Sequence, residues 1–310
     1  MKAYIQAFQG KPWNAECESA YRGFRNLGFE TVLFSNTDEL IAITQNDIVV
    51  GGMLMMNHVF NTYKIHVGTY DYPNELISFL ERKISIIKVL DIDGLTLPVF
   101  IKPVEEKIAK GIVIDSWDKA SDYKNLSEDT EIYCSEVLEL KSEWRCFVCV
   151  DKLVGVQIYN GNKDFTCDLD TVSRAINAYA NNRKRPAAYT LDFGVTADGK
   201  TVLIEMNDGF AVGSYGLDDV EYAKFLLARW ADLTGFCYEC ALRLAGPFVK
   251  RNQYAILKNK REAYFITDII EAGRLYMGYD INNETKADIE IRYEDIEYTV
   301  NEICKNVVID

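Results

Sequence analysis

The chain has 310 residues, of which 48% are hydrophobic and 26% charged, the mixture of an ordinary globular protein. Its net charge of -13 and pI near 4.8 argue against nucleic acid or an anionic membrane surface as partner, because both need clustered lysine and arginine. No run of about eighteen apolar residues is present, so we expect no transmembrane helix. The N-terminus lacks the apolar core of a signal peptide, which makes the cytoplasm the expected compartment.

The N-terminal part is expected to form a small α/β unit with a partly parallel sheet. Strand-like runs cover 3–8, 31–35 and 47–52, and a helix capped by Asn14 reaches about Leu27. Further along, a helix is expected over 53–63, a short helix over 74–80, and a strand or helix end over 83–91.

From about Leu97 the pattern changes to hairpins, with a helix expected between the second and third strands. The expected strands are 97–103, 111–115, 131–140, 142–150, 153–160, 187–195 and 201–208. Asp170 can cap an amphipathic helix that reaches about Asn181, and another helix is expected over 220–233. The remaining chain alternates short β-like runs with acidic stretches.

The hairpin at 187–208 carries the most informative polar residues. Its arms flank the turn Ala197–Lys200, a strong hairpin signal. Pairing of the arms brings Asp192 beside the segment with Glu205 and Asn207, which share one strand face. Two carboxylates and an amide are hard oxygen ligands that suit Mg²⁺ held with triphosphate oxygens. Taken alone, these residues are better explained as the polar face of an exposed hairpin.

Lysines upstream of this hairpin favour a phosphate site. Lys102 lies within an apolar strand, where it faces either solvent or a phosphate. The polar loop after it carries Lys107 and Lys110 and ends in Gly111, and such a loop can fold over phosphates.

A second upstream group suits the nucleoside. Glu136, Val137 and Leu138 could offer backbone groups and apolar side chains to an adenine ring. Glu143 and Arg145 follow on one strand, two residues apart, and therefore on the same face.

The order of these features along the chain resembles that of the ATP-grasp superfamily: a lysine in a strand, a flexible loop, two glutamates, and then Asp…Glu-x-Asn. Thirteen residues separate Asp192 from Glu205 and two separate Glu205 from Asn207, as in the D-alanine–D-alanine ligase type of site. More narrowly, the chain resembles the "R-two-K" clade of bacteria and phages in the segments DYPNEL, LPVFIKPVEEKIAKG, SEVLELKSEWRCFV and LDFGVTADGKTVLIEMNDG. The resemblance covers roughly residues 45–220.

This resemblance implies an α+β (mixed α/β) chain with an ATP-grasp fold, in which two α+β subdomains hold the nucleotide between them. It implies an N-terminal α/β pre-ATP-grasp domain over 1–95 and an ATP-grasp domain over 96–245, with a hinge near 136–139. Residues 246–310 then form a C-terminal β-rich acidic appendage.

The resemblance also implies roles for individual residues at the nucleotide. Lys102 would contact the ATP phosphates, with Lys107 or Lys110 as a second contact. Residues 136–138 would line the adenine, and Glu143 would bind the ribose hydroxyls.

At the reacting end, the resemblance gives Arg145 a place beside phosphate or an acylphosphate, as a catalytic residue together with Lys102. Asp192, Glu205 and Asn207 would hold Mg²⁺, or Mn²⁺ in its place.

The implied activity is an ATP-dependent ligase that joins a carboxylate to an amine, or to another nucleophile, through an acylphosphate. The substrate would be a small molecule such as an amino acid, a peptide or a protein terminus, and ADP and phosphate would be released. One alternative is a catalytically silent ATP-binding module that regulates or binds a partner. Another is an ATP-dependent modifier of RNA, although the acidic tail favours a cationic or peptide partner.

Other polar residues leave two interpretations open. The basic run from Arg183 to Arg185 is either a solvated charge cluster or a substrate contact. Ser214 lies in a turn that could hold an anion. His58 and His66 are expected to be structural or surface residues rather than general bases.

The eight cysteines are expected to be free thiols. Two pairs have CxxC spacing, Cys146 with Cys149 and Cys237 with Cys240, which would suit a zinc site. Cys146 and Cys149 lie in a strand pattern, however, and residues three apart on a strand point to opposite faces. Buried structural thiols are therefore favoured over zinc.

Overall fold

The computed structural model describes residues 2–40, 43–44, 47–68, 70–105, 108–238, 254–257, 263–270, 275–281, 289–292 and 296–300. These residues contain four β-sheets, of which three lie within the first 238 residues. Within the same ranges, none of the helices is long and apolar enough to cross a membrane.

The N-terminal sheet is built around a central strand. It contains β1 (Lys2–Phe8), β2 (Lys11–Pro12), β3 (Glu30–Phe34) and β4 (Ile48–Val50). The pairs β1–β3 and β1–β4 are parallel and β1–β2 is antiparallel, which confirms the predicted partly parallel sheet. Its helices are α1 (Ala15–Asn26), the 3-10 helix η1 (Thr37–Leu40) and α2 (Met53–Tyr63). Asn14 caps α1 as predicted, accepting a hydrogen bond from Cys17 N at 2.9 Å.

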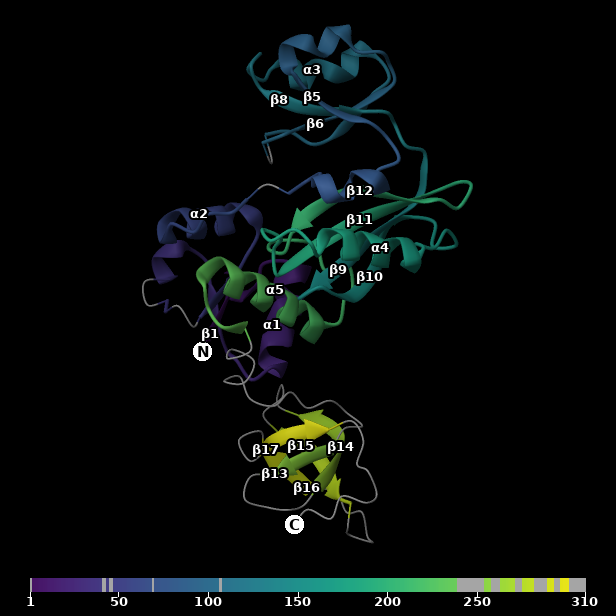
Figure 1. Ribbon diagram of the computed structural model, residues 1–310. Helices are drawn as coiled ribbons and strands as arrows, with labels where there is room; N and C mark the ends of the chain where they lie inside the picture. The colour runs from purple at the N-terminus through teal and green to yellow at the C-terminus, as the bar shows by residue number, and fades with distance from the viewer. Residues whose placement is uncertain are drawn as a thin grey trace.

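A smaller antiparallel sheet follows the 3-10 helix η2 (Asn74–Phe79) and lies at the top of Figure 1. Its strands, in spatial order, are β5 (Ile84–Lys88), β8 (Glu131–Ser135), β6 (Val99–Pro103) and β7 (Ile112–Ile114). The 3-10 helices η3 (Val89–Gly94) and η4 (Trp117–Ala120) and the helix α3 (Ser121–Lys124) accompany it. Because β5 pairs with β8, residues before the predicted boundary at 96 contribute to this sheet.

The larger antiparallel sheet lies in the centre of Figure 1. Its strands, in spatial order, are β10 (Lys152–Gly161), β9 (Leu140–Cys149), β11 (Ala188–Thr196) and β12 (Thr201–Asp208). The helix α4 (Leu169–Tyr179) packs on one face and α5 (Asp219–Thr234) on the other. The predicted cap of α4 was wrong by two residues: Asp168, not Asp170, accepts from the backbone N–H groups of Asp170 and Thr171.

The two faces of this sheet separate the cysteines of the first CxxC pair. Cys146 belongs to the core beneath α4, whereas Cys149 belongs to the core shared with α5. Both cysteines are free thiols. Because they belong to cores on opposite faces of the sheet, the predicted opposite orientation is confirmed. Cys237 is an exposed free thiol, and Cys240 lies outside the described residues.

The helices α1 and α5 join the N-terminal unit to the larger sheet through one continuous core. Ser19 Oγ donates to Asp219 Oδ1 at 2.7 Å, and Arg22 Nε donates to Asp219 Oδ2 at 2.6 Å. Gly23 permits this close approach, because a Cβ there would lie 1.9 Å from Asp219 O.

The fourth sheet, at the bottom of Figure 1, belongs to the C-terminal part of the chain. Its antiparallel strands, in spatial order, are β16 (Ile289–Arg292), β15 (Leu275–Asp280), β14 (Ala263–Ile270), β13 (Tyr254–Leu257) and β17 (Ile296–Val300). The strands agree with the β-rich pattern predicted for this part.

Candidate active site

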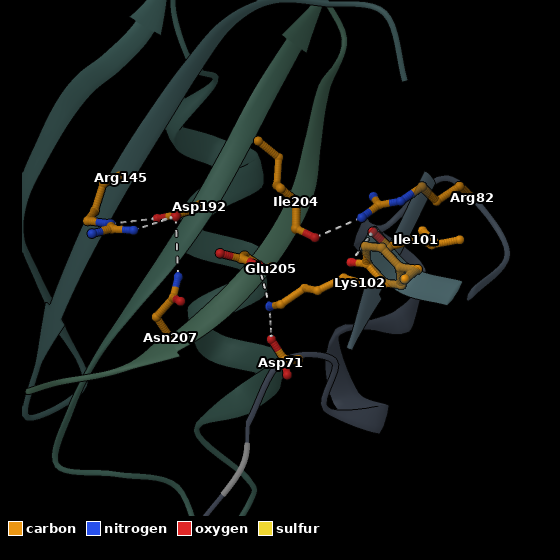
Figure 2. Close-up of polar contacts among 10 residues, drawn as sticks. Asp71, Arg82, Ile101, Lys102, Arg145, Asp192, Ile204, Glu205 and Asn207 are labelled. Atoms are coloured by element: carbon orange, nitrogen blue, oxygen red, sulfur yellow. Dashed lines mark hydrogen bonds and ion pairs between the residues drawn. The ribbon is translucent and has the colours of Figure 1, made fainter. Parts of the chain in front are cut away.

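The site is built on the β11–β12 hairpin. Asp192 pairs directly with Glu205 across the two strands, and Asn207 Nδ2 donates to Asp192 Oδ2 at 3.2 Å. The ladder shifts register after Asp192, so that Ile204 is an extra residue on β12. Its carbonyl accepts from Arg82 Nη2 at 2.7 Å, which secures this irregular part of the edge strand. The three predicted metal ligands therefore lie together (Figure 2).

Arg145, on the neighbouring strand β9, forms a buried two-point ion pair with Asp192 (Figure 2). Its Nε donates to Oδ1 at 2.9 Å and its Nη2 to Oδ2 at 2.7 Å. Burial opposes the charge of the guanidinium, but the bonds to Asp192 outweigh it and raise the pKa of Arg145. Burial also raises the pKa of Asp192, an effect that Arg145 opposes. Each of these buried side chains therefore needs the charge of the other, or a replacement of equal charge, to stay ionised.

Lys102 reaches from the smaller sheet to the hairpin (Figure 2). Its Nζ donates to Glu205 Oε2 at 2.8 Å and to Asp71 Oδ1. Although burial alone would lower the pKa of Lys102, the charges of Glu205 and Asp71 outweigh burial and raise it. Asp71 is fixed in turn, because its carbonyl accepts from Met206 N on β12 at 2.9 Å. Lys102 is thus a charged link between the two sheets.

Both ion-pair clusters border one cavity of about 740 Å³. Its lining brings together residues from α2, β6, the following loop, β9, β12 and the loop after β12. The residues are Met53, Asp71, Phe100, Lys102, Ile108, Ala109, Lys110, Gly111, Arg145, Glu205, Asn207, Asp208, Phe210, Ala211, Val212 and Gly213. Asp192 is buried directly behind this lining.

The loop after β6 closes one side of the cavity. Lys110 and Gly111 line it, and the carbonyl of Lys110 accepts from the hydroxyl of Tyr123 at 2.7 Å. Lys107 lies outside the described residues. Of the two predicted loop lysines, the structure therefore places Lys110 at the cavity.

The residues predicted for adenine and ribose do not line this cavity. Glu136 is exposed and its Oε2 accepts from Lys83 N at 2.9 Å, while Val137 and Leu138 are half-buried. Glu143 Oε1 accepts from the side-chain amide of Asn160 at 2.7 Å. Their nucleotide roles remain predictions.

The predicted substrate residues are dispersed. Arg183 is exposed, and Arg185 forms an ion pair with Asp151 beyond the end of β9, where Nε and Oδ1 are 2.7 Å apart. Neither borders the cavity. Ser214 is buried next to Gly213, which does border it.

The two histidines, His58 and His66, are exposed and do not line the cavity. This agrees with the prediction that they are structural or surface residues rather than general bases.

Two acidic residues at the cavity were not predicted. Asp71 contacts Lys102, and Asp208 is held by Arg229 through bonds of 2.5 and 2.6 Å. Their neighbours in the sequence could have drawn attention to both residues. Asp71 directly precedes Tyr72-Pro73, and Asp208 directly follows the predicted ligand Asn207.

The oxygen ligands on the hairpin fit a hard divalent cation. Glu205 and Asn207 border the cavity and Asp192 lies directly behind them, so that two carboxylates and an amide are close together, the ligand types that suit Mg²⁺ when phosphate oxygens complete its shell. Within the part of the chain that the structure describes, no cluster of three or more His, Cys, Asp or Glu side chains suits a metal. That finding is consistent with a set in which the third ligand is an amide.

Comparison with known proteins gives one family match. Residues 79–225 match the family described as ATP-grasp domain, R2K clade family 2. The matched residues contain all strands of the larger and of the smaller sheet. They also include Lys102, Arg145, Glu205 and Asn207, which border the cavity, and Asp192, which lies behind it. A search of curated proteins finds no match.

Solved structures similar to this chain include a synthetase and two ligases. D-cycloserine synthetase DcsG is 12% identical, with a TM-score of 0.48, over 74% of this chain and 100% of that one. The ATP-grasp ligase PsnB complexed with minimal precursor, Mg and ADP is 12% identical, with a TM-score of 0.42, over 74% and 97%. D-alanine–D-alanine ligase from Bacillus anthracis complexed with ATP is 11% identical, with a TM-score of 0.43, over 79% and 97%.

The family match rests on the segment that supplies both sheets of the cavity and its cation–carboxylate pairs. On that match, residues 79–225 are similar to the ATP-grasp domain of R2K clade family 2.

Proposed function

We propose that the protein is a Mg-ATP-dependent ligase that activates a carboxylate as an acylphosphate and transfers the acyl group to an amine. The main support is the convergence of two cations and the oxygen ligands on one cavity. Lys102 and Arg145 are held by the same carboxylates, Glu205 and Asp192, that would bind the metal. Such a site is preorganised for charge neutralisation, which is the main task of a protein in phosphoryl transfer.

Asp192, Glu205 and Asn207 would hold Mg²⁺, which supplies positive charge at the phosphate oxygens when bound. Lys102 and Arg145 would then turn their charges to the transferred phosphoryl group. Lys110, at the mouth of the same cavity, offers a further cation for the triphosphate. The roles of these residues are positioning and charge stabilisation, and no protein nucleophile is required.

The chemistry has two balanced steps. An oxygen of the substrate carboxylate bonds to the γ-phosphorus as the bond to the β-phosphate oxygen breaks, giving an acylphosphate and ADP. The amine nitrogen then bonds to the acyl carbon, phosphate leaves, and the nitrogen loses a proton. Arg145 faces the group that carries negative charge in both steps.

A second cavity, of about 270 Å³, adjoins the first and is our candidate for the acceptor. The two share Met53 and the segment 211–213, and the second extends to Trp13, Glu16 and Gly52 of the N-terminal unit. Its mixture of an aromatic ring, backbone groups and one carboxylate suits an amino acid or the end of a peptide. This mixture and the size of the cavity support an amino acid or peptide end as the acceptor.

ADP release with added acceptors tests this function. Amino acids and short peptides would be supplied with Mg-ATP, and products would be identified by mass spectrometry. We expect an adduct with loss of water, and no turnover by Glu205→Gln combined with Asn207→Ala. The exposed Glu128→Gln serves as the matched control, with normal turnover. Retained turnover in the double variant would refute the site, and ADP without an adduct would favour a protein that does not ligate.

A further inference from the structure

Two tyrosines lie against the guanidinium of Arg145. The Cζ atom of Arg145 is 5.1 Å from the ring centre of Tyr215 and 5.7 Å from that of Tyr159. The two rings stack on each other, with centres 5.2 Å apart and planes inclined by 25°. Both distances are within the range of cation–π attraction. Arg145 therefore has an aromatic support in addition to its ion pair with Asp192.

The backbone is irregular at both tyrosines. On β10, Tyr159 is an extra residue between the pairs Ile158–Trp144 and Asn160–Glu143. A bulge of this kind redirects a side chain, and bulges are frequent beside active sites. Tyr215 has φ of 47°, a conformation that a bulky residue rarely adopts. Two independent departures from regular backbone thus serve the same ring stack, which suggests a role beyond packing.

The loop that carries Tyr215 also borders the cavity. Gly213 lines the cavity, and a Cβ at this position would lie 2.8 Å from Cζ of Tyr215. The ring of Tyr215 therefore packs directly on the glycine backbone at the cavity wall. From there it contacts Arg145, whose side chain also borders the cavity. The stack connects the wall of the phosphate end to its buried arginine.

The hydrogen bonds of Arg145 explain why a second support matters. Its Nε and Nη2 both donate to Asp192, which is also a predicted metal ligand. A cation bound to Asp192 weakens those bonds, and the guanidinium then needs another fixed contact. The aromatic faces are suited to this because they hold a cation without competing for the metal. Burial, with the charges of Asp192 and Glu143, raises the pKa of Tyr159, so its ring stays neutral.

We propose that Tyr159 and Tyr215 form an aromatic clamp that positions Arg145 toward the phosphate when Asp192 turns to Mg²⁺. This inference rests on the proposed function and assigns the two tyrosines as positioning residues. The active element is the face of each ring. The hydroxyl of Tyr159 bonds with Glu143 rather than with Arg145, so neither phenol hydroxyl is needed to position the guanidinium. Phenylalanine should therefore replace either tyrosine, whereas leucine should not.

The test measures Mg²⁺ binding without turnover. Wild type, Tyr215→Phe, Tyr215→Leu, Tyr159→Phe and Tyr159→Leu are titrated with Mg²⁺ at a fixed concentration of a non-hydrolysable ATP analogue. The readout is thermal stabilisation. We expect each leucine variant to need about tenfold more Mg²⁺, corresponding to loss of roughly 1.4 kcal/mol from a desolvated cation–π contact. The phenylalanine variants should match wild type, and ADP release should follow the same order.

Two results would overturn the clamp. Leucine variants that match wild type would show that the rings do not position Arg145. Equal losses with phenylalanine and leucine would assign the effect to the hydroxyl.

A wild-type protein that binds no Mg-nucleotide would refute the proposed function itself. In that case a double-mutant cycle between Arg145→Met and Tyr215→Leu, read by urea unfolding, decides whether the clamp exists. The cycle is repeated with Asp192→Asn. Coupling that persists without the Asp192 charge supports the clamp, and absent coupling refutes it.

Discussion

Gly23 lies where α1 meets the start of α5, and Gly23→Ala is expected to destabilise the protein. Helix propensity alone predicts the opposite sign, because alanine is favoured over glycine by about 1 kcal/mol. A Cβ at Gly23 would, however, lie 1.9 Å from the backbone oxygen of Asp219 and 2.8 Å from the side chain of Ala223. Relief requires the two helices to separate, which lengthens the bonds from Ser19 and Arg22 to Asp219.

Overpacking of this kind costs roughly 1–3 kcal/mol, and here it includes a backbone contact that no rotamer change removes. After the propensity gain is subtracted, we therefore expect a net loss of up to about 2 kcal/mol in the free energy of unfolding, measured by urea denaturation of the full chain. Gly94→Ala is the control, because a Cβ there meets no atom within 4 Å. It should stabilise the protein by about 0.4–1 kcal/mol. A Gly23→Ala protein at least as stable as wild type would refute the close approach of α1 and α5.

Three further changes test the site, a helix cap and an ion pair. Lys102→Ala should weaken Mg-ATP binding about 10- to 100-fold, the effect of losing a charged hydrogen bond, and an unchanged Kd in calorimetry would make Lys102 structural. Asp168→Ala should lower the free energy of unfolding by about 1 kcal/mol, whereas Asp170→Ala should change it little, if Asp168 is the cap. Burial would raise the pKa of Asp219, but bonds from Arg22 and Ser19 outweigh it and lower the pKa. Stability from this carboxylate is therefore present above its unfolded pKa of about 3.9 and lost as pH falls further. Arg22→Met should reduce the loss of unfolding free energy at acid pH. An unchanged loss in this variant would contradict the role of Arg22 in lowering the pKa of Asp219.

The sequence was sufficient to predict the hairpin and the proximity of Asp192, Glu205 and Asn207, because local rules determine the strands and the turn. The turn brings the two arms side by side, but the direct pairing of Asp192 with Glu205 also depends on the extra residue Ile204. Regular counting from Val195–Thr201 would pair Asp192 with Ile204 instead. The same alternation placed Cys146 and Cys149 on opposite faces. The capping residue of α4 was harder, because Asp168 and Asp170 are chemically equivalent and only the backbone shows which one precedes the first turn.

Contacts between distant segments were not predictable in this way. Asp71 reaches Lys102 from a loop whose position depends on a backbone bond to β12. The stack of Tyr159 and Tyr215 depends on a bulge and a left-handed residue that no strand or turn pattern indicates. Alternation alone does not reveal where a ladder gains an extra residue. The residues that complete the site were therefore missed, while those on its regular strands were found.

The charges around the cavity indicate how an empty site and a loaded one can share the same side chains. Asp71, Asp192 and Glu205 face Lys102 and Arg145, so in these two clusters the buried or half-buried carboxylates outnumber the cations by one. Each cation is already engaged, and a triphosphate alone would meet this excess of negative charge. A divalent cation reverses the excess and releases the lysine and arginine for the phosphates. On the proposed function, metal and nucleotide therefore depend on each other for binding, because the buried pair of Arg145 with Asp192 cannot be broken without a replacement charge.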